Sequence, residues 1–523
     1  MIDSSDNAPP PIPRRWEAPC PNCGAVVPFA SSTTPYAVCS YCRSTVVREG
    51  EVLRRIGESA ELIDSRSRLQ LGTSGVQDRR AFTLVGRVQY GYGEGVASLD
   101  GTWTEWHALF DDGRSGWLSE DNDQYVIAFD RDDSGGAPPF GALEVGQSLR
   151  LADSDWRVAS IVRARAIAAE GELPTRPALD SAHPIVDLRN AHNQVATLDY
   201  LDERAPTLAI GNPVRLAELA LQGLVDGPDL GLATVGGRSF DCPSCGAACA
   251  PKREDTQSMS CTSCFALIDL SKGVGADLTA FQQRQRVQPK IALGTVGRLG
   301  FGAHKPVEWQ VIGFSVKTAN SGSDGSFAWR DYLLHNVGEG FAFLIDSDDG
   351  WVGYRTMTGV PEQGRNARTV RWKNAPYVQV DAYRAQVSYV EGEFYWAVRR
   401  DDSVLTTDFN GVGAMSARRL SKESTDSEVV WSEGSIIPAD AVRKAFRLSA
   451  PKTVPSFAPY VSDGIGPLSD DIGPLSDGSG SLIKYALIVA AILIFLFVLN
   501  DNQRGMVLRA ASDGYIYTGG GHK

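Results

Sequence analysis

The segment Cys20-Pro-Asn-Cys23 is followed, fifteen residues later, by Cys39-Ser-Tyr-Cys42. The same arrangement returns 222 positions further along the chain as Cys242-Pro-Ser-Cys245 and Cys261-Thr-Ser-Cys264. Two pairs of cysteines, each separated by two residues in a tight turn, can direct four sulfur atoms at one tetrahedral centre, which is the geometry that zinc prefers. The spacing therefore predicts two structural zinc ions, one for each group of four cysteines.

The length and composition indicate a chain of several folded domains. A chain of 523 residues is too long for one hydrophobic core and suggests roughly three or four units. The hydrophobic content of 43% is that of a globular protein. The net charge of −12 argues against a nucleic-acid-binding protein, because affinity for phosphates depends on clustered Lys and Arg. We therefore expect cationic or neutral partners.

The cysteines and the N-terminus both bear on the compartment. Eight of the nine cysteines belong to the two groups, which favours metal binding in a reducing compartment over a disulfide framework. We interpret the ninth, Cys249, as a partly buried free thiol, because nothing nearby marks an activated thiolate. Acidic residues and prolines stand at 1–15, where a secretory signal has a basic end and an apolar stretch, so we expect a flexible arm there and no export.

The two cysteine groups predict zinc ribbons at 16–49 and 238–272. The loop between the cysteine pairs of the first ribbon contains no Lys or Arg. In the second ribbon, Lys252 and Arg253 are followed at once by two acidic residues. A ribbon that binds nucleic acid generally needs basic residues at its tip, so we expect these ribbons to stabilise the fold or to contact a protein.

The duplication continues beyond the cysteines. At the same offset, Leu71-Gly-Thr73 matches Leu293-Gly-Thr295. Further matches, at offsets of 226 and 221, join Trp103-Thr-Glu105-Trp106 to Trp329-Arg-Asp331-Tyr332 and Glu170-Gly-Glu172 to Glu391-Gly-Glu393. The chain is therefore a tandem repeat of two units of roughly 200 residues.

Each repeat reads as short strands bounded by turns. Runs rich in β-branched and aromatic residues lie at Phe82–Tyr90, Trp309–Val316 and Ala385–Val390, and Asp-Gly turns occur at 112–113 and 349–350. Only 213–224 and 439–448 resemble helices. The pattern predicts a mainly β protein with a small barrel or sandwich in each repeat, at 68–215 and 290–447.

Several of these motifs together resemble a known family. They are the ribbon, the segments Trp103–Phe110 and Trp329–His335, the aromatic-Leu pairs at 117–118 and 343–344, and the Glu-Gly-Glu turns. The combination is similar to an uncharacterised bacterial family, domain of unknown function 4178, in two tandem copies. The resemblance implies a domain type without a catalytic signature, often found in company with membrane proteins and with genes of polyamine synthesis.

Six acidic residues recur in both copies, in two kinds of place. Glu105 and Asp331 stand beside aromatic residues, and the other four are Glu170, Glu172, Glu391 and Glu393. Such carboxylates can line a pocket for a polyamine-like cation, with Trp faces adding cation–π attraction. The alternative, which we favour from the sequence, is that they are solvated strand or turn carboxylates, because Glu and Asp are mostly exposed.

Catalytic patterns are weak throughout the chain. The sequence contains no HExxH, GxGxxG, GxxxxGK[ST] or GxSxG motif. His107 and His335 lie in the matched aromatic segments but are out of register by two positions when those segments are aligned. No catalytic residue is therefore predicted, and the enzyme hypothesis has no positive support.

The composition changes after residue 450. Residues 451–481 form an acidic linker rich in Pro, Gly and Ser, and 482–499 is an apolar run interrupted only by Lys484. Eighteen helical residues span about 27 Å, so we expect a transmembrane helix followed by a polar tail at 500–523. The charges around the run favour a cytoplasmic tail. The cysteines and the missing signal favour a cytoplasmic N-terminal part, and we follow the latter.

These features predict a membrane-anchored binding or scaffold component built from two zinc-stapled β modules. The anchor is 482–499, and we expect a protein partner, with no role for nucleic acid. The alternative is a protein that binds a small polyamine-like cation, or an enzyme that acts on one.

Overall fold

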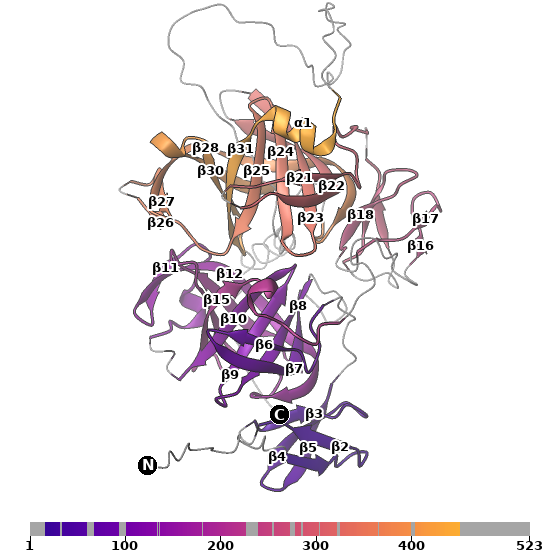
Figure 1. Cartoon of the computed structure of the whole chain (residues 1–523), viewed down its shortest axis with the longest axis vertical. Coiled ribbons are helices and arrows are strands. Elements are labelled where there is room, and N and C mark those ends of the chain that lie inside the picture. Colours follow the sequence, from indigo (N-terminus) through magenta and orange to yellow (C-terminus); the bar gives the residue numbers. More distant parts are fainter. Residues whose placement is uncertain are drawn as a thin grey trace, which may run out of the picture.

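The two repeats fold as two eight-stranded antiparallel barrels, each with a cysteine ribbon before it (Figure 1). This architecture confirms the mainly β prediction and selects the barrel over the sandwich. The computed structural model describes residues 16–449 apart from 32–33, 60–66, 94–100, 133, 135, 180, 226–238, 254–255, 272–277, 284–285, 303, 322–324, 365 and 399–402.

The first ribbon consists of a small hairpin and a three-stranded meander. Strand β1 (Trp16–Pro19) pairs with β2 (Val26–Phe29), and β3 (Tyr36–Val38), β4 (Ser44–Glu49) and β5 (Val52–Glu58) form a meander. The meander joins the first barrel because β3 pairs with the end of the long strand β12.

The first barrel is closed by eight strands, and four short elements lie around it. The barrel strands are β7 (Arg80–Tyr92), β8 (Gly101–Phe110), β9 (Ser115–Asp121), β10 (Gln124–Arg131), β12 (Ser154–Leu173), β13 (His183–Arg189), β14 (Val195–Asp199) and β15 (Thr207–Val214). The surrounding elements are β6 (Ser74–Gln77), β11 (Ser148–Leu151), η1 (Phe140–Ala142) and η2 (Leu216–Glu218). Pairing of β10 with β15 and of β12 with β7 closes the barrel.

The second repeat has the same topology. Its ribbon contains β16 (Phe240–Asp241), β17 (Ala248–Cys249), β18 (Ser258–Ser260), β19 (Leu267–Asp269) and β20 (Thr279–Phe281). The barrel strands are β22 (Val307–Ser321), β23 (Gly325–Asn336), β24 (Gly340–Ser347), β25 (Gly350–Met357), β28 (Ala375–Phe394), β29 (Ser403–Gly411), β30 (Arg418–Ser424) and β31 (Val429–Ile437). Around them lie β21 (Val296–Leu299), β26 (Glu362–Gln363), β27 (Thr369–Trp372), η3 (Gly413–Met415) and α1 (Ala439–Phe446).

A long strand in each barrel holds barrel and ribbon together. Strand β12 has 20 residues and pairs with β11, β13, β7 and the ribbon strand β3. It bends at a bulge between Ala166 and Ala168, as strands do where an extra residue interrupts the ladder. At its ribbon end the backbones approach closely, since a Cβ on Gly86 would lie 2.0 Å from the carbonyl oxygen of Glu172. Only glycine fits there.

The apolar face of the barrel strands packs against the peripheral elements. In the first barrel, Trp106 and Leu118 pack with Leu219, which follows η2. In the second barrel, Tyr332 and Leu344 pack against Phe446 of α1 and its neighbours. Because side chains alternate between the two faces of a strand, the opposite face of the same strands points into the barrel.

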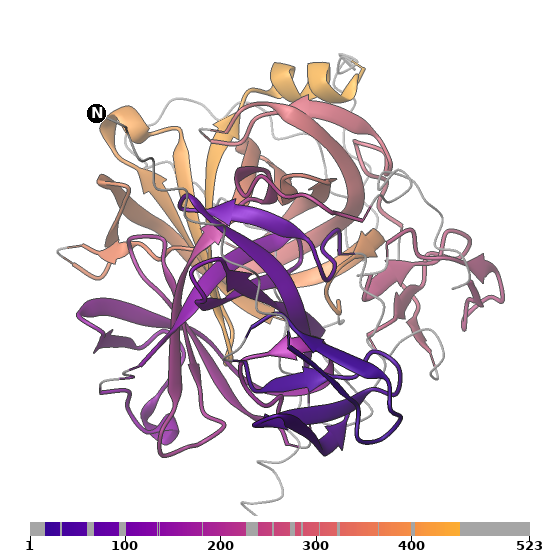
Figure 2. The ribbon, with the colours of Figure 1, turned by 60° about the horizontal axis from the view of Figure 1, so that its bottom comes forward.

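The two barrels lie end to end, with the first ribbon beyond the first barrel (Figures 1 and 2). The hairpin between β30 and β31 reaches β12 of the first barrel, where the Ile161 N–H donates to the carbonyl of Ser427 at 3.0 Å. A second contact joins the Val360 N–H to the carbonyl of Asn190 at 3.1 Å. The second repeat therefore covers one end of the first barrel.

Two predictions about helices can be compared with this fold. The helix predicted at 439–448 corresponds to α1, whereas 213–224 contains the end of β15 and the single turn η2. Among the helices that the structure describes, none is long and apolar enough to cross a membrane. The arm at 1–15, the linker at 451–481, the predicted span at 482–499 and the tail at 500–523 lie outside the described residues.

Candidate functional site

Each group of four cysteines is gathered at one point. Within each group, the four sulfur atoms lie within 4.8 Å of one another. In the first ribbon, Sγ–Sγ distances are 3.6 Å for Cys20 and Cys42 and 3.7 Å for Cys23 and Cys39. Tetrahedral zinc with Zn–S bonds of about 2.3 Å requires sulfur atoms about 3.8 Å apart. The geometry therefore fits a metal ion.

The second ribbon repeats this geometry. The Sγ–Sγ distances are 3.8 Å for Cys242 and Cys264 and 3.7 Å for Cys245 and Cys261. The sulfur of Cys249 lies outside this group of four and is 3.6 Å from the carbonyl oxygen of Ala247. Two groups of four cysteines can thus each hold a metal ion, and the ninth cysteine is a buried thiol beside one of them.

The second Glu of each Glu-Gly-Glu turn attaches a ribbon to its barrel. Glu172 accepts hydrogen bonds from the N–H groups of Ala30 and Ser31, at 2.6 and 3.0 Å. Glu393 accepts from the N–H groups of Lys252 and Arg253 at 3.0 and 3.1 Å. Glu393 also accepts from the hydroxyl of Thr256 at 2.8 Å. Both carboxylates are buried, which contradicts our expectation of solvated side chains.

The first Glu of each turn lies apart from these anchors. Glu170 forms an ion pair with Arg87 at 2.7 Å, and Arg87 stacks over the ring of Trp106 on the apolar face of the barrel. Glu391 accepts a hydrogen bond from the hydroxyl of Tyr389 at 2.9 Å. Sequence spacing alone does not show this division of roles, because residues two apart in a strand are expected to share a face.

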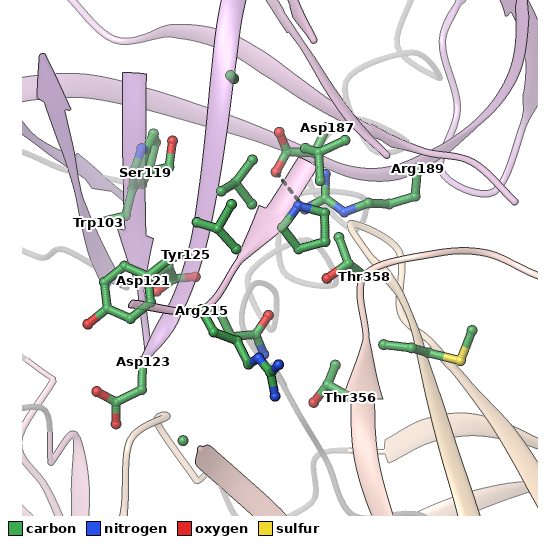
Figure 3. A pocket seen from close by; sticks show the side chains of 18 of the residues that line it. Trp103, Ser119, Asp121, Asp123, Tyr125, Asp187, Arg189, Arg215, Thr356 and Thr358 are labelled. Atoms are coloured by element: carbon green, nitrogen blue, oxygen red, sulfur yellow. Dashed lines mark ion pairs between the residues drawn. The ribbon is translucent and has the colours of Figure 1, made fainter. Parts of the chain in front are cut away.

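The first barrel encloses a cavity of about 740 Å³. All eight of its strands contribute side chains, among them Tyr92, Trp103, Ser119, Ala128, Val162, Asp187, Thr197 and Ala209. The second repeat completes the wall through the β23–β24 turn, the end of β25 and the start of β31 (Figure 3). The cavity is therefore formed by both copies, a feature that the sequence does not predict.

Glu105 lies on the wall of this cavity. Its carboxylate accepts a hydrogen bond from the indole N–H of Trp103 at 3.2 Å. Burial, together with the negative charges of Asp187, Asp199 and Asp130, raises the pKa of Glu105 from its ordinary value to about 7. The ring of Trp103 is stacked on that of Tyr90, with centroids 4.9 Å apart. An acidic group thus stands beside an aromatic wall.

More carboxylates line the part of the cavity that lies nearer to the second repeat. Burial raises the pKa of Asp121 to about 7, and it raises that of Glu428 well above its ordinary range. Asp187 accepts a hydrogen bond from Thr197 at 2.9 Å and lies 3.6 Å from Arg189 (Figure 3). The carboxylates raise one another's pKa, so the cavity has an acidic wall on which several of these groups keep their protons near neutral pH unless a positive charge lies close by.

Three of the four arginines that line this cavity are paired with carboxylates, and the fourth is Arg68. Arg189 pairs with Asp187, as described above. At the edge, Arg355 pairs with Glu339 at 2.8 Å. Arg215, labelled in Figure 3, pairs with Glu218. These pairs leave the acidic character of the inner wall in place.

The second barrel is filled where the first is open. Ala128 lies opposite Trp117 in the first barrel, and Tyr354 takes the corresponding place opposite Phe343 in the second. In the same way, Val162 lies opposite Ile185 in the first barrel. Tyr383, opposite Thr406, takes the place of Val162 in the second barrel. Tyr354 and Tyr383 are buried in the second core. Two large rings thus occupy space that remains empty in the first barrel.

The acidic partner of Glu105 in the second barrel is Asp331. It is buried and forms an ion pair with Lys317, whose Nζ lies 3.1 Å from Asp331 Oδ2. Glu105 and Asp331 therefore correspond in sequence but have different surroundings. Glu105 faces a cavity, and Asp331 is paired within a packed core.

The two histidines of the matched segments occupy different surroundings. The Nδ1 of His107 lies 2.8 Å from the carbonyl oxygen of Glu172, and its Nε2 lies 2.9 Å from the hydroxyl of Ser115. Burial lowers the pKa of His107 to about 4, so the ring is neutral. His335 instead lies at the contact between the barrels, 2.9 Å from Asp123.

Comparisons with known proteins place the chain in a family. No curated protein matches the chain. A solved structure, that of the vaccine antigen Transferrin Binding Protein B (TbpB) mutant Trp-176-Ala from Haemophilus parasuis Hp5, matches with 8% identity and a TM-score of 0.11, over 81% of this chain and 86% of that one. The family described as Domain of unknown function (DUF4178) matches residues 70–216 and 300–439, more than half of the chain. The chain therefore belongs to the DUF4178 family, and it carries two copies of the domain.

Proposed function

We propose that this protein binds a small organic cation in the cavity of its first barrel. The observation that carries the proposal is Glu105, a carboxylate on the cavity wall beside the stacked rings of Trp103 and Tyr90. Among the residues that the structure describes, no lysine or arginine forms an ion pair with Glu105. A bound cation would supply the missing positive charge.

The properties of the cavity support this proposal. Its volume of about 740 Å³ lies within the usual range for small-molecule sites, about 300 to 1,000 Å³. A buried carboxylate is stabilised in its charged form by a nearby positive charge. The face of Trp103 can add cation–π attraction of about 0.5 to 2 kcal/mol.

The arrangement of the acids favours a ligand with two positive charges. Glu105 lies opposite Ser119 on β9, and Asp121 is the next residue on the same face of that strand. Two residues along a strand correspond to about 7 Å. A polyamine-like cation, such as a diammonium ion with a short alkyl chain, would place one positive charge near Glu105 and the other near Asp121.

The ribbons would support this site through zinc. We propose that each group of four cysteines binds one zinc ion, because thiolate groups at this spacing are its preferred structural ligands. Zinc would hold the ribbon folded, and Glu172 and Glu393 would hold each folded ribbon against its barrel. This role requires no chemistry at the metal.

A membrane-anchored binding or scaffold protein is the second candidate function. It is favoured by the apolar run at 482–499 and by the linker before it, which would give the cytoplasmic barrels freedom to reach a protein partner. If this candidate is correct, the protein should remain with membranes after a carbonate wash, and a chain ending at residue 481 should not. Release of both forms by the wash would remove it.

Calorimetric titration tests the cation site. The full chain, purified in detergent, is titrated with 1,4-diaminobutane, spermidine and methylammonium, and with sodium ions as the control for ionic strength. We expect saturable binding of one diammonium ion per chain and about 10- to 100-fold weaker binding to Glu105→Gln. Glu170→Gln, on the other face of the same barrel, should bind like the natural protein. Absence of saturable heat with all three amines would refute the proposal.

A further inference from the structure

The two barrels differ at the position beside the matched carboxylates. In the first barrel, Tyr90 lies opposite Trp103 in the β7–β8 ladder, and Glu105 is two residues further along β8. In the second barrel, Lys317 lies opposite Trp329 in the β22–β23 ladder, and Asp331 is two residues further along β23. Since the two Trp residues and the two acids correspond, Lys317 takes the place of Tyr90.

In the second barrel this substitution provides an internal ammonium group. Lys317 and Asp331 have side chains that are only 5% and 6% exposed, and their charged atoms are 3.1 Å apart. Lys317 lies opposite Trp329 in the β22–β23 ladder, and Trp329 and Tyr383 belong to one buried core. An ammonium ion on an alkyl chain is therefore accommodated within the packed core.

In the first barrel the matched carboxylate, Glu105, borders an open cavity. Tyr90 turns its ring against Trp103 and carries no positive charge, and the cavity extends past Ala128 and Val162, where the second barrel has two tyrosines. Glu105 thus has a cavity beside it, whereas the matched Asp331 has the ammonium of Lys317 beside it. Both barrels thus contain a carboxylate near a Trp residue. In the second barrel a lysine ammonium pairs with this carboxylate, and in the first barrel the carboxylate borders a cavity.

We propose that the group bound by Glu105 is the primary ammonium of an alkylamine, in the place that the Lys317 ammonium takes in the second barrel. The inference rests on the proposed function and adds the chemical class of the bound group. The second barrel is then a permanently occupied copy, and only the first barrel takes a ligand. A primary ammonium fits because its three N–H donors and slender stem match those of lysine.

The sharpest test supplies the first barrel with its own lysine. In Tyr90→Lys, the new ammonium should pair with Glu105 and exclude the ligand, so that 1,4-diaminobutane binds about 100-fold more weakly than to the natural protein. Val76→Lys, which introduces a lysine at an exposed position of β6 away from the cavity, is the control and should bind within about threefold of the natural protein. The double variant Tyr90→Lys with Glu105→Asp reproduces the pair of the second barrel and tests the same point if the single variant is unstable. Undiminished binding to folded Tyr90→Lys would overturn the inference.

A second test uses the other barrel and does not depend on the first cavity. Lys317→Ala removes the ammonium and leaves Asp331 buried without it, so the melting temperature should fall. Propylammonium, which replaces the missing part of the side chain, should restore it more than tetramethylammonium or sodium at equal concentration. Equal effects of the three ions would contradict the assignment of a primary-ammonium site.

The two failures can be told apart. If the natural protein binds no amine at all, the proposed function is wrong. If it binds amines and the tetramethylated ion binds as tightly as the primary one, the proposed function stands and the present inference is wrong.

Discussion

Asp123 of the first barrel accepts a hydrogen bond from His335 of the second, with 2.9 Å between Asp123 Oδ2 and His335 Nε2. Arg253 of the second ribbon stacks over the ring of Phe341, and its guanidinium lies 3.7 Å from the same carboxylate. One side chain of the first barrel thus joins the second barrel and its ribbon. The contact lies at the end of the cavity that the second repeat closes.

Removal of this carboxylate should loosen the contact between the repeats. In Asp123→Ala, a charged hydrogen bond is lost and Arg253 loses a partner, so we expect a decrease of about 1 to 3 kcal/mol in the free energy of unfolding in urea. Asp155→Asn removes an exposed ion pair with Arg150 and should change the stability by less than about 0.5 kcal/mol. Equal stabilities for the two variants would contradict a structural role for Asp123.

Cation binding should strengthen as the pH rises through about 7. The pKa of Glu105 is raised to about 7 by burial, and that of Asp121 is raised to about 7 in the same way. A cation binds to the ionised form, so affinity for 1,4-diaminobutane should fall by about tenfold per pH unit for each group that must ionise, as the pH decreases from 7 to 5. In Glu105→Gln the dependence should become less steep. An affinity independent of pH would contradict the role of these carboxylates.

The same shifts predict the pH dependence of the ligand-free protein. Glu105 has a folded pKa above its ordinary value near 4.5, so the folded state binds its proton more tightly than the unfolded state does. Its contribution to stability is therefore complete below about pH 4.5 and is lost as the pH rises through about 7. Melting temperatures at pH 6 and 8 should differ more for the natural protein than for Glu105→Gln. Addition of 1,4-diaminobutane should offset the loss at pH 8.

The cysteine groups predict two zinc ions per chain. Cys39→Ser should reduce the zinc content measured by elemental analysis from two ions to about one, because a ligand of the first group is removed. Cys249→Ser is the matched control, since its sulfur lies outside the group of four, and should keep two ions. Loss of zinc in both variants, or in neither, would contradict the assignment of ligands.

Glu393 should hold the second ribbon against its barrel. In Glu393→Ala, the N–H groups of Lys252 and Arg253 lose their acceptor, so hydrogen exchange of these two amides should become about 10- to 100-fold faster. Glu362→Ala, at an exposed position of β26, should leave them unchanged. Unchanged exchange in Glu393→Ala would show that strand pairing alone attaches the ribbon.

The sequence predicts the fold class, the repeat and the groups of four cysteines well. These features depend on local patterns: strand alternation, turn residues and the spacing of cysteines. The cavity depends on contacts far apart in the chain, because it needs Ala128 and Val162 on different strands and a hairpin from the other repeat. The roles of the Glu-Gly-Glu residues were also hidden, since Gly171 between the two Glu residues has a φ of +72°, which departs from regular strand geometry, and Glu172 reaches the ribbon.

One signal for the open site was present in the sequence. When the Trp residues at 103 and 329 are aligned, the strands before them contain Tyr90 and Lys317. The offset between the repeats changes by a few residues along the chain, and this change conceals the match. The ladders of the folded barrels remove this ambiguity, because each of the two residues lies opposite its Trp.

A crystal structure of the full chain grown with 1,4-diaminobutane tests the central claim most directly. The cation-site account predicts density for the diamine in the first barrel, with one nitrogen about 2.8 Å from the carboxylate of Glu105 and none in the second barrel. A diamine bound elsewhere, or a first barrel without it at concentrations that saturate binding in solution, would contradict the account.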